Sequence, residues 1–487
     1  MCKEIFPYHM QNTKIVKLIK SLNQYEIRAF KDFVHSPFFN KNKNVSKLFD
    51  ELKKFYPKFT GNDLSEESIY KKIFPGEKFD YFKLKNAVSD LFKLSKEFLS
   101  FTRIKLKGRL KEKFLLEELR ERNLDSIFEQ SYKSAVKQNE ETLVKDENYV
   151  LHKMDLTEEF ISYNAPKRPN ENLNLQQVKL DLFTKYSIIR FLKSYNLMMH
   201  EEKQNNLKFD KRMFDEVLKY IEKSNFEDNP TLLVYYNIIM LEKNREDTHF
   251  YKLKSLREKY SDELNDYDRY MIFLHMNGYC THIYNIHSRT DFFREQFEIV
   301  KEKNSRESTV TSKLLYPDFL NEVKIAVRVN EFKWADEYIE KNKHKFQDEK
   351  ESTLNFCYGL INYKKGNYEE ALSSFSKTYF PNFIIKLQVK ILQLQIYFEM
   401  GYYEQAISMI DTFRHYLKRE ETIKEDFKIS FYEFLRLTND LIKLESGYYE
   451  KDNRFYVEKL KSEISNMTSN QFGIRLWLSE KIDIHKS

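Results

Sequence analysis

Glycine and proline are scarce in this chain. Each occurs nine times among 487 residues, far below the usual frequencies of about 7% and 5%. Sandwiches and barrels of β-strands need turn residues at intervals of about ten positions. The shortage of turn residues therefore excludes a fold of many short strands. The sequence predicts an all-α protein in which long helices are separated by few turns.

Cysteine is also rare, and Cys2, Cys280 and Cys357 lie far apart in the chain. This spacing fits neither a disulfide framework nor a zinc module, and it is consistent with a reducing compartment. No stretch approaches the eighteen apolar residues of a membrane span. Charges interrupt residues 1–22, where a secretory signal would need an apolar core. We therefore expect a cytoplasmic protein without a membrane partner.

Recognisable catalytic and cofactor-binding motifs are missing as well. The glycines are scattered, so the sequence contains neither a G-x-G-x-x-G loop nor a phosphate loop ending in Lys-Ser or Lys-Thr. A G-x-S-x-G nucleophile elbow is also absent. Carboxylates are so numerous that no pair can be chosen as acid and base. We expect no enzymatic activity and no cofactor; an enzyme within the helical array stays open as a third class of function.

One predicted helix concentrates metal-ligating residue types: His275, Cys280, His282 and His287. Their seven-residue spacings place His275 near the face of His282, and Cys280 near that of His287, and these two faces differ. Metal ligands on a helix usually stand three or four residues apart. We therefore expect packed or exposed histidines here and no metal site.

The residues that are abundant favour amphipathic helices. Charged residues make up 32% of the chain and hydrophobic residues 41%, a balance that argues against disorder. Aromatic residues reach 16%, with 41 Phe and 33 Tyr. The core is therefore predicted to be built largely on aromatic rings.

A repeated phrase marks the last third of the chain. Two near-copies of Gly-x-Tyr-Glu-x-Ala begin at Gly366 and Gly401, 35 residues apart, and a fainter copy begins at Asn330. Gly and Asn suit a left-handed backbone at the turn between two helices. The aromatic residue fills the open end of the pair, and the small Ala lets the helices approach closely. A period near 34 residues indicates stacked helical pairs.

The phrase resembles the tetratricopeptide repeat. The copy over residues 352–381 matches that family's pattern at Gly359, Gly366, Tyr368, Ala371 and Phe375. The next copy matches at Tyr397, Gly401, Tyr403 and Ala406, but has Leu394 and Ile410 at the small and late-aromatic positions. The clearest repeats cover residues 316–420. The resemblance implies an α-solenoid of helical hairpins.

In repeats of this family the first helix of each pair lines a concave face. The corresponding positions here are Lys324, Arg328, Phe356, Leu360, Tyr363, Lys364, Gln388, Ile391, Gln395 and Glu399. This mixture of aromatic, amide and charged side chains suits a peptide or protein partner, and packing between repeats is the alternative for several of them. Phe356 and Leu360 stand where the family's carboxylate-binding clamp has Lys and Asn. Capture of a chaperone C-terminus is therefore not predicted.

Residues 1–113 are predicted to form a separate basic helical module. Helices are expected over 13–22, 25–35, 45–56, 66–74 and 81–106. Asn23 and Glu26 form a capping pair at the start of the second, and Ser36-Pro37 ends it. This module has 25 Lys and Arg against 13 Asp and Glu, whereas residues 114–487 have 57 against 62. The positive charge is thus concentrated in the first part of the chain.

A run of basic residues closes the module: Arg103, Lys105, Lys107, Arg109, Lys111 and Lys113. It is a candidate surface for nucleic acid or another acidic partner. The alternative is a solvated helix face in a Lys-rich protein, which we favour because no nucleic-acid-binding motif accompanies the charge.

Residues 114–487 are predicted to form the tetratricopeptide-like array. Pro166 and Pro169 indicate an internal loop, and residues 471–484 are expected to form a terminal helix that covers the last apolar face. The preferred function is a non-catalytic scaffold in a bacterial cytoplasm that binds a protein or peptide. The alternative is a regulator whose basic module binds nucleic acid while the array senses a partner.

Overall fold

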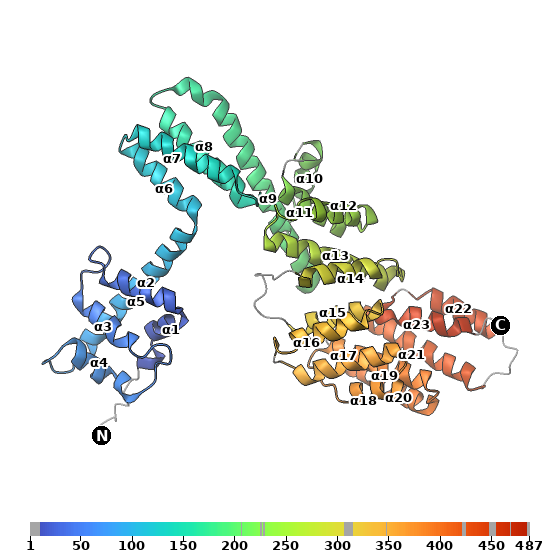
Figure 1. Cartoon of the computed structure of the whole chain (residues 1–487). Helices are drawn as coiled ribbons and strands as arrows, with labels where there is room; N and C mark the ends of the chain where they lie inside the picture. The colour runs from blue at the N-terminus through green and yellow to red at the C-terminus, as the bar shows by residue number, and fades with distance from the viewer. Residues whose placement is uncertain are drawn as a thin grey trace. The chain divides into compact units, whose positions relative to one another are not determined.

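The computed structural model describes residues 10–205, 207–224, 226, 229–305, 315–346, 348–420, 425–447, 454–467 and 469–484. Within these ranges the chain forms 23 α-helices and no β-strand, which confirms the prediction of an all-α protein (Figure 1). None of the helices in these ranges combines the length and the apolar character of a transmembrane span.

Contacts between residues divide the chain into two compact units. The first comprises Met1–Glu141 and His152–Lys179, and the second comprises Thr142–Leu151 and Leu180–Ser487. Two helices contribute residues to both units, namely α8 (Glu147–Asn164) and α9 (Leu173–Asn205).

The first unit begins with five helices that share one core. They are α1 (Lys14–Ser21), α2 (Gln24–His35), α3 (Lys43–Lys53), α4 (Glu66–Ile73) and α5 (Tyr81–Leu106). Their bounds agree with the predicted ranges to within three residues. The long α5 contacts α1, α2, α3 and α4. Phe30 and Phe49 are fully buried, and their ring centroids lie 5.0 Å apart. An aromatic core is therefore present, as the composition predicted.

Local sequence signals at α2 are confirmed. The side chain of Asn23 accepts hydrogen bonds from the backbone N–H groups of Tyr25 and Glu26, and the Glu26 carboxylate accepts one from the Asn23 N–H at 2.8 Å. This reciprocal capping box satisfies donors that a helix start leaves unpaired. The helix ends at His35, directly before the predicted stop at Ser36-Pro37.

A second core in the first unit joins α6 (Gly108–Glu121), α7 (Asp125–Glu140) and the part of α8 after residue 151. Phe128 and Tyr163 stack there with centroids 4.1 Å apart. The predicted end of the basic module, residue 113, lies within α6, and that boundary stays a prediction.

The second unit continues with fourteen helices after α9. They are α10 (Phe214–Lys223), α11 (Pro230–Asn244), α12 (Asp247–Lys259), α13 (Asp266–His287), α14 (Phe293–Ser305), α15 (Tyr316–Arg328), α16 (Phe332–Asn342), α17 (Lys350–Lys365), α18 (Tyr368–Ser376), α19 (Phe383–Glu399), α20 (Tyr403–Arg419), α21 (Glu425–Glu445), α22 (Arg454–Ser465) and α23 (Ile474–Asp483).

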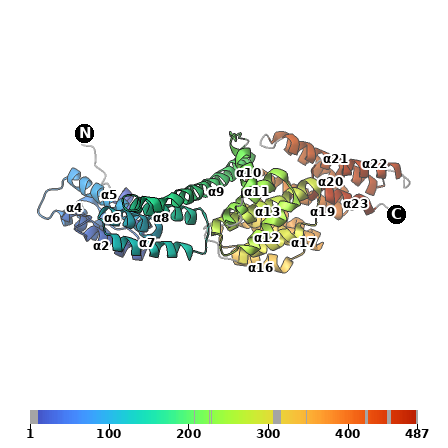
Figure 2. The ribbon, with the colours of Figure 1, turned by 90° about the horizontal axis from the view of Figure 1, so that it is seen from above.

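Successive helices of the second unit pack as neighbours. Contacts join α11 with α12, α13 with α14, α15 with α16, α17 with α18, and α19 with α20. Further contacts join α11 with α13 and α15 with α17. Helices α20–α23 lie together in both views (Figures 1 and 2), in agreement with the contacts of α21 with α20 and α23. The apolar stripe of each helix is thus covered by the next helices in the sequence.

The repeated phrase has the predicted backbone geometry. Asn330, Gly366 and Gly401 all have the left-handed conformation, with φ of 61°, 82° and 71°. The Ala residues of the three copies are completely buried; they are Ala335, Ala371 and Ala406. Each turn reverses the chain between two helices that contact each other.

Close packing of α17 and α18 depends on Gly359. A Cβ atom at this position would lie 3.0 Å from Cε1 of Phe375, whose ring is buried. Real Cβ atoms rarely come so close to a neighbour, so the missing side chain of Gly359 makes room for the ring. Gly359 and Phe375, two positions of the repeated pattern, are therefore in direct contact.

Gly359→Val should therefore lower the free energy of unfolding by about 1–3 kcal/mol, because overpacking displaces the Phe375 ring. Gly278→Val is the matched control, since Gly278 is exposed within α13 and a Cβ there would meet no atom within 4 Å. The control should change stability by only a few tenths of a kcal/mol. Chemical denaturation of both variants measures the difference; equal stabilities would contradict this account of the α17–α18 contact.

Candidate functional site

Two cations stand one turn apart on α15. Lys324 and Arg328 are four residues apart, so their side chains leave the same face of the helix. An adjacent side of α15 is packed in the core through Val323 and Val327, which are buried. Lys324 and Arg328 are half-buried and project toward side chains of α13, α14, α17 and α19.

Arg328 is held between aromatic rings. Its guanidinium carbon lies 4.5 Å from the ring centroid of Tyr284 on α13 and 4.7 Å from that of Phe293 on α14. One Nη donates to Oε1 of Gln296 at 3.3 Å. The Gln296 amide donates in turn to Asn277 Oδ1 at 2.7 Å and to Thr281 Oγ at 3.0 Å, which directs its oxygen toward Arg328. The guanidinium is thus fixed in position by neutral groups.

Lys324 is also surrounded by neutral groups. Its Nζ donates to Oε1 of Gln388 on α19 at 3.1 Å and lies 5.9 Å from the ring centroid of the buried Phe356. Burial, and secondly the positive charge of Arg328, lower the pKa of Lys324 from 10.5 to about 8. Burial likewise lowers the pKa of Arg328. Among the described residues, no carboxylate forms an ion pair with either cation.

The other residues predicted for the concave face have different surroundings. Phe356, Ile391 and Gln395 are buried, and Leu360 packs half-buried against the core. The Tyr363 hydroxyl donates to Gln395 Oε1 at 3.3 Å. Lys364 is exposed. The structure thus brings Lys324 together with Gln388 and Tyr363 with Gln395, and presents Lys364 to solvent.

Glu399, the last of these residues, is bound by the C-terminal helix. Its carboxylate accepts a hydrogen bond from Trp477 Nε1 at 3.0 Å. It also forms an ion pair with Lys481, whose Nζ lies 2.7 Å from the carboxylate. The Trp477 ring contacts Phe398 and Phe434, with centroids 5.2 and 6.1 Å away. Helix α23 therefore covers the end of α19, where the sequence predicted a surface for a partner.

The segment before α23 docks on the end of α13. Asn470 N donates to Asn285 O at 2.7 Å, and Arg475 donates to Ile286 O at 3.0 Å and to the Ser288 hydroxyl. Gly473 has φ of 79°, and a Cβ there would lie 2.1 Å from the Tyr284 hydroxyl. The predicted continuous helix over 471–484 is wrong at its start, since this left-handed turn separates a 3₁₀ turn (Gln471–Gly473) from α23.

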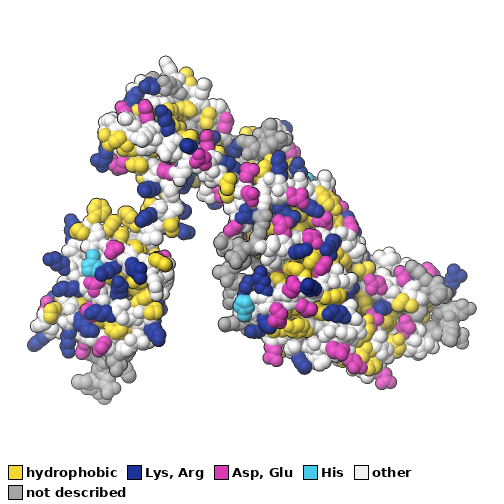
Figure 3. Space-filling model, in the orientation of Figure 1, with side chains coloured by type: hydrophobic (Ala, Val, Ile, Leu, Met, Phe, Trp, Pro, Cys, Tyr) yellow, Lys and Arg dark blue, Asp and Glu magenta, His cyan; other side chains and the backbone are white. Residues whose placement is uncertain are grey.

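The basic run near residue 113 is divided by the fold. Arg109 and Lys113 both pair with the buried carboxylate of Asp155 on α8. These two ion pairs join α6 to α8. Arg103, Lys105, Lys107 and Lys111 are exposed. Figure 3 shows many Lys and Arg side chains, with hydrophobic side chains among them, over the visible face of the first unit.

Exposed aromatic rings lie near the exposed cations. Phe38 is 83% exposed and its ring contacts Phe39, which in turn contacts Phe33 and Phe101. Phe101 is 51% exposed and precedes Arg103 by two residues on α5. Sequence reasoning did not identify this cluster, because Phe33 and Phe39 are far from Phe101 in the chain and none of them belongs to a motif.

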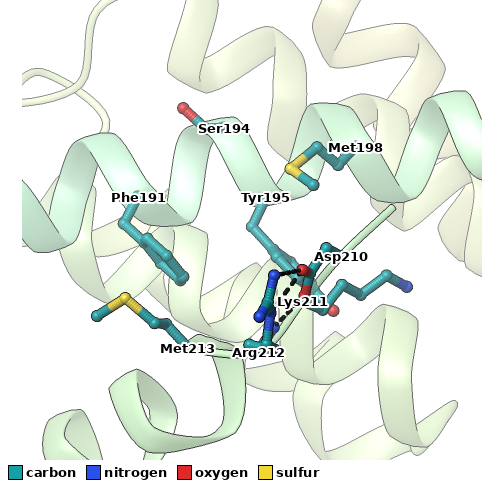
Figure 4. Close-up of a pocket in the computed structure, with 8 residues that line it drawn as sticks. All are labelled: Phe191, Ser194, Tyr195, Met198, Asp210, Lys211, Arg212 and Met213. Carbon is teal, nitrogen blue, oxygen red and sulfur yellow. Dashed lines mark hydrogen bonds and ion pairs between the residues drawn. The ribbon is translucent and has the colours of Figure 1, made fainter. Parts of the chain in front are cut away.

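A pocket lies between α9 and the segment that leads into α10 (Figure 4). Its volume is about 340 Å³, and Phe191, Tyr195, Met198 and Met213 make it largely apolar. Its charged residues are paired, Arg212 with Asp210 and Lys211 with Glu202. This pocket can accept an apolar group, but it contains no pair of residues arranged as nucleophile and base.

Metal and thiol chemistry find little support in the described part of the chain. No group of three His, Cys, Asp or Glu side chains there could hold a metal ion. His275 is buried and its Nδ1 lies 2.8 Å from Glu242. Cys280 and Cys357 are buried, which raises the pKa of Cys280 to about 12 and that of Cys357 further, so both thiols stay protonated near neutral pH. Cys2 lies outside the described residues.

The chain matches no protein-family model, no curated protein and no solved structure.

Lys324→Met should stabilise the protein at neutral pH. The pKa of Lys324 is lower in the folded state than in the unfolded state, so protonation costs folding free energy below pH 8. That cost disappears as the pH rises from about 8 to 10.5. The free energy of unfolding of the variant should therefore exceed that of the wild type by about 1–3 kcal/mol at pH 7. This difference in stability should vanish near pH 10.5. Urea denaturation across this range measures it, and a pH-independent difference would contradict the assignment.

Proposed function

We propose that this protein is a tetratricopeptide-like helical-repeat scaffold that binds a protein or peptide partner and has no catalytic role. The observation that carries the proposal is the recurrence of one turn geometry at Asn330, Gly366 and Gly401, each joining two packed helices with a buried Ala. Repeats of this type stack into an α-solenoid, whose first helices form an extended binding surface.

The side chains on the first helices also support partner binding. Lys324 and Arg328 on α15 are half-buried but have no paired carboxylate among the described residues, and Lys364 at the end of α17 is exposed. Polar donors that the protein itself leaves unused are typical of a surface that recognises a ligand. The covered end of α19, where Glu399 meets α23, is excluded from this proposed surface.

A photoreactive amino acid placed at position 364 tests the proposal in cells that naturally produce the protein. We expect a covalent adduct of defined mass with a partner protein. Position 333 is the matched control, because Lys333 is 91% exposed on the second helix of a pair, α16. Absence of an adduct at 364, or the same adduct at both positions, would argue against a partner on the first helices.

Nucleic-acid binding by the first unit is the second candidate. The observation that favours it is the combination of exposed Lys105 and Lys107 with exposed aromatic rings, Phe38 and Phe101, on one unit. Cations bind phosphates and aromatic rings stack on unpaired bases, so this combination suits a single strand. The basic residues Arg109 and Lys113 are excluded from it, since they pair with Asp155.

Reversing two charges tests this candidate. Lys105→Glu with Lys107→Glu should weaken binding of a labelled single strand, and the slope of log affinity against log salt should fall by about 0.7 for each lost phosphate contact. Lys364→Glu with Lys365→Glu, two exposed residues of α17, provides the control. Fluorescence anisotropy over a salt series measures both. Equal effects of the two double variants would remove nucleic acid from consideration.

A further inference from the structure

The cations on α15 differ from many other half-buried cations in the second unit. Several buried or half-buried cations there are paired with carboxylates: Lys193 with Glu147 and Asp268, Lys254 with Glu295, Arg257 with Glu302, and Lys303 with Glu322. Lys324 and Arg328 instead meet two amide oxygens and three aromatic rings. Their charges are oriented but not neutralised, although placing a charge away from water is costly unless it is paired.

The arrangement also leaves donors free. Arg328 has five N–H donors, of which one bonds Gln296, and Lys324 has three, of which one bonds Gln388. As whole residues, neither Lys324 nor Arg328 is fully buried. The rings of Tyr284 and Phe293 restrict the guanidinium plane, which reduces the entropy lost when a ligand binds.

We propose that Lys324 and Arg328 form a binding site for a phosphate monoester. Two positive charges one turn apart match the charge of −1.5 to −2 that a phosphate monoester carries near pH 7, whereas a single carboxylate would leave one cation unmatched. The phosphate oxygens also offer acceptors to the planar Arg fork and to the Lys ammonium together. The neighbouring groups Gln296, Gln388 and Phe356 add no negative charge that would repel the ligand.

The proposed phosphate site lies on α15, one of the first helices that the proposed function assigns to partner binding, and it therefore rests on that proposed function. The phosphate could belong to a modified side chain of a protein partner or to a small phosphorylated molecule, and both present the same group to the site. A charged Lys324 lowers the stability of the fold, because an apolar residue at this position would avoid a half-buried charge and would not need Gln388 as a partner. This cost is consistent with a role of Lys324 in binding.

Calorimetric titration of the full chain at fixed ionic strength provides the test. The probes are inorganic phosphate, a phosphoserine peptide with its unphosphorylated form, and succinate as a dianion without phosphate geometry. We expect saturable binding of phosphate or the phosphopeptide, weakened about tenfold or more in Lys324→Gln and in Arg328→Gln. Lys333→Gln, an exposed cation of α16, should bind as the wild type does. Tighter binding of the phosphopeptide than of phosphate would assign the source to a protein, and the reverse order to a small molecule.

A second readout avoids dependence on the folding of the variants. An anion beside Lys324 should raise the pKa of its amine above the value of about 8, so saturating phosphate should shift the midpoint of Lys324 acylation upward by about one pH unit in the wild-type protein. No saturable phosphate or phosphopeptide binding, no shift of this midpoint, or equally tight binding of succinate would overturn the proposal. If the wild-type protein binds no phosphate but a partner still crosslinks at position 364, the phosphate site is rejected and the proposed scaffold function stands.

Discussion

Burial of aromatic and aliphatic side chains between successive helices is the constraint on which the second unit depends. Helices with one apolar face are not stable alone in water and need neighbours that cover that face. Here the neighbour is usually the next helix in the sequence, and the fit is close: the ring of Phe375 occupies the space that a side chain at Gly359 would fill, and Ala371 and Ala406 have no exposed surface. The turn residues matter because they direct each helix back onto its predecessor.

The polar groups on α15, α17 and α19 follow a different rule. Tyr363 with Gln395, and Glu399 with Trp477 and Lys481, are satisfied by other parts of the same chain. Lys324 and Arg328 are positioned by amides and rings but not neutralised. Proteins commonly keep such energetically costly arrangements where a ligand binds, since binding recovers what folding loses. This contrast among α15, α17 and α19 is the reason for proposing a ligand site on α15.

Much of the helical structure could be predicted from the sequence, because its signals are local. The capping box of Asn23 and Glu26, the left-handed turns at Gly366 and Gly401, and the close contact at Gly359 each depend on residues near one another in the chain or in a repeated pattern. Contacts between distant segments gave no such signal. The pairing of Arg109 and Lys113 with Asp155 spans more than forty residues, and the docking of Arg475 on Ser288 spans 187. Those contacts decide which predicted site residues are accessible, so the candidate site was predicted less well than the helices.

The contact between the C-terminal segment and α13 has a consequence for how the molecule loses its structure. In a linear stack of repeats, each repeat touches only its neighbours, so the last one can fray while the others remain folded. Here Asn470, Gly473 and Arg475 connect the C-terminal segment to α13, a helix that lies far earlier in the chain. Detaching the end therefore also breaks bonds in the middle, and the intervening helices α14–α22 are closed into a loop. Hydrogen exchange in this region should accordingly follow one cooperative opening, with no gradient of protection from the end inward.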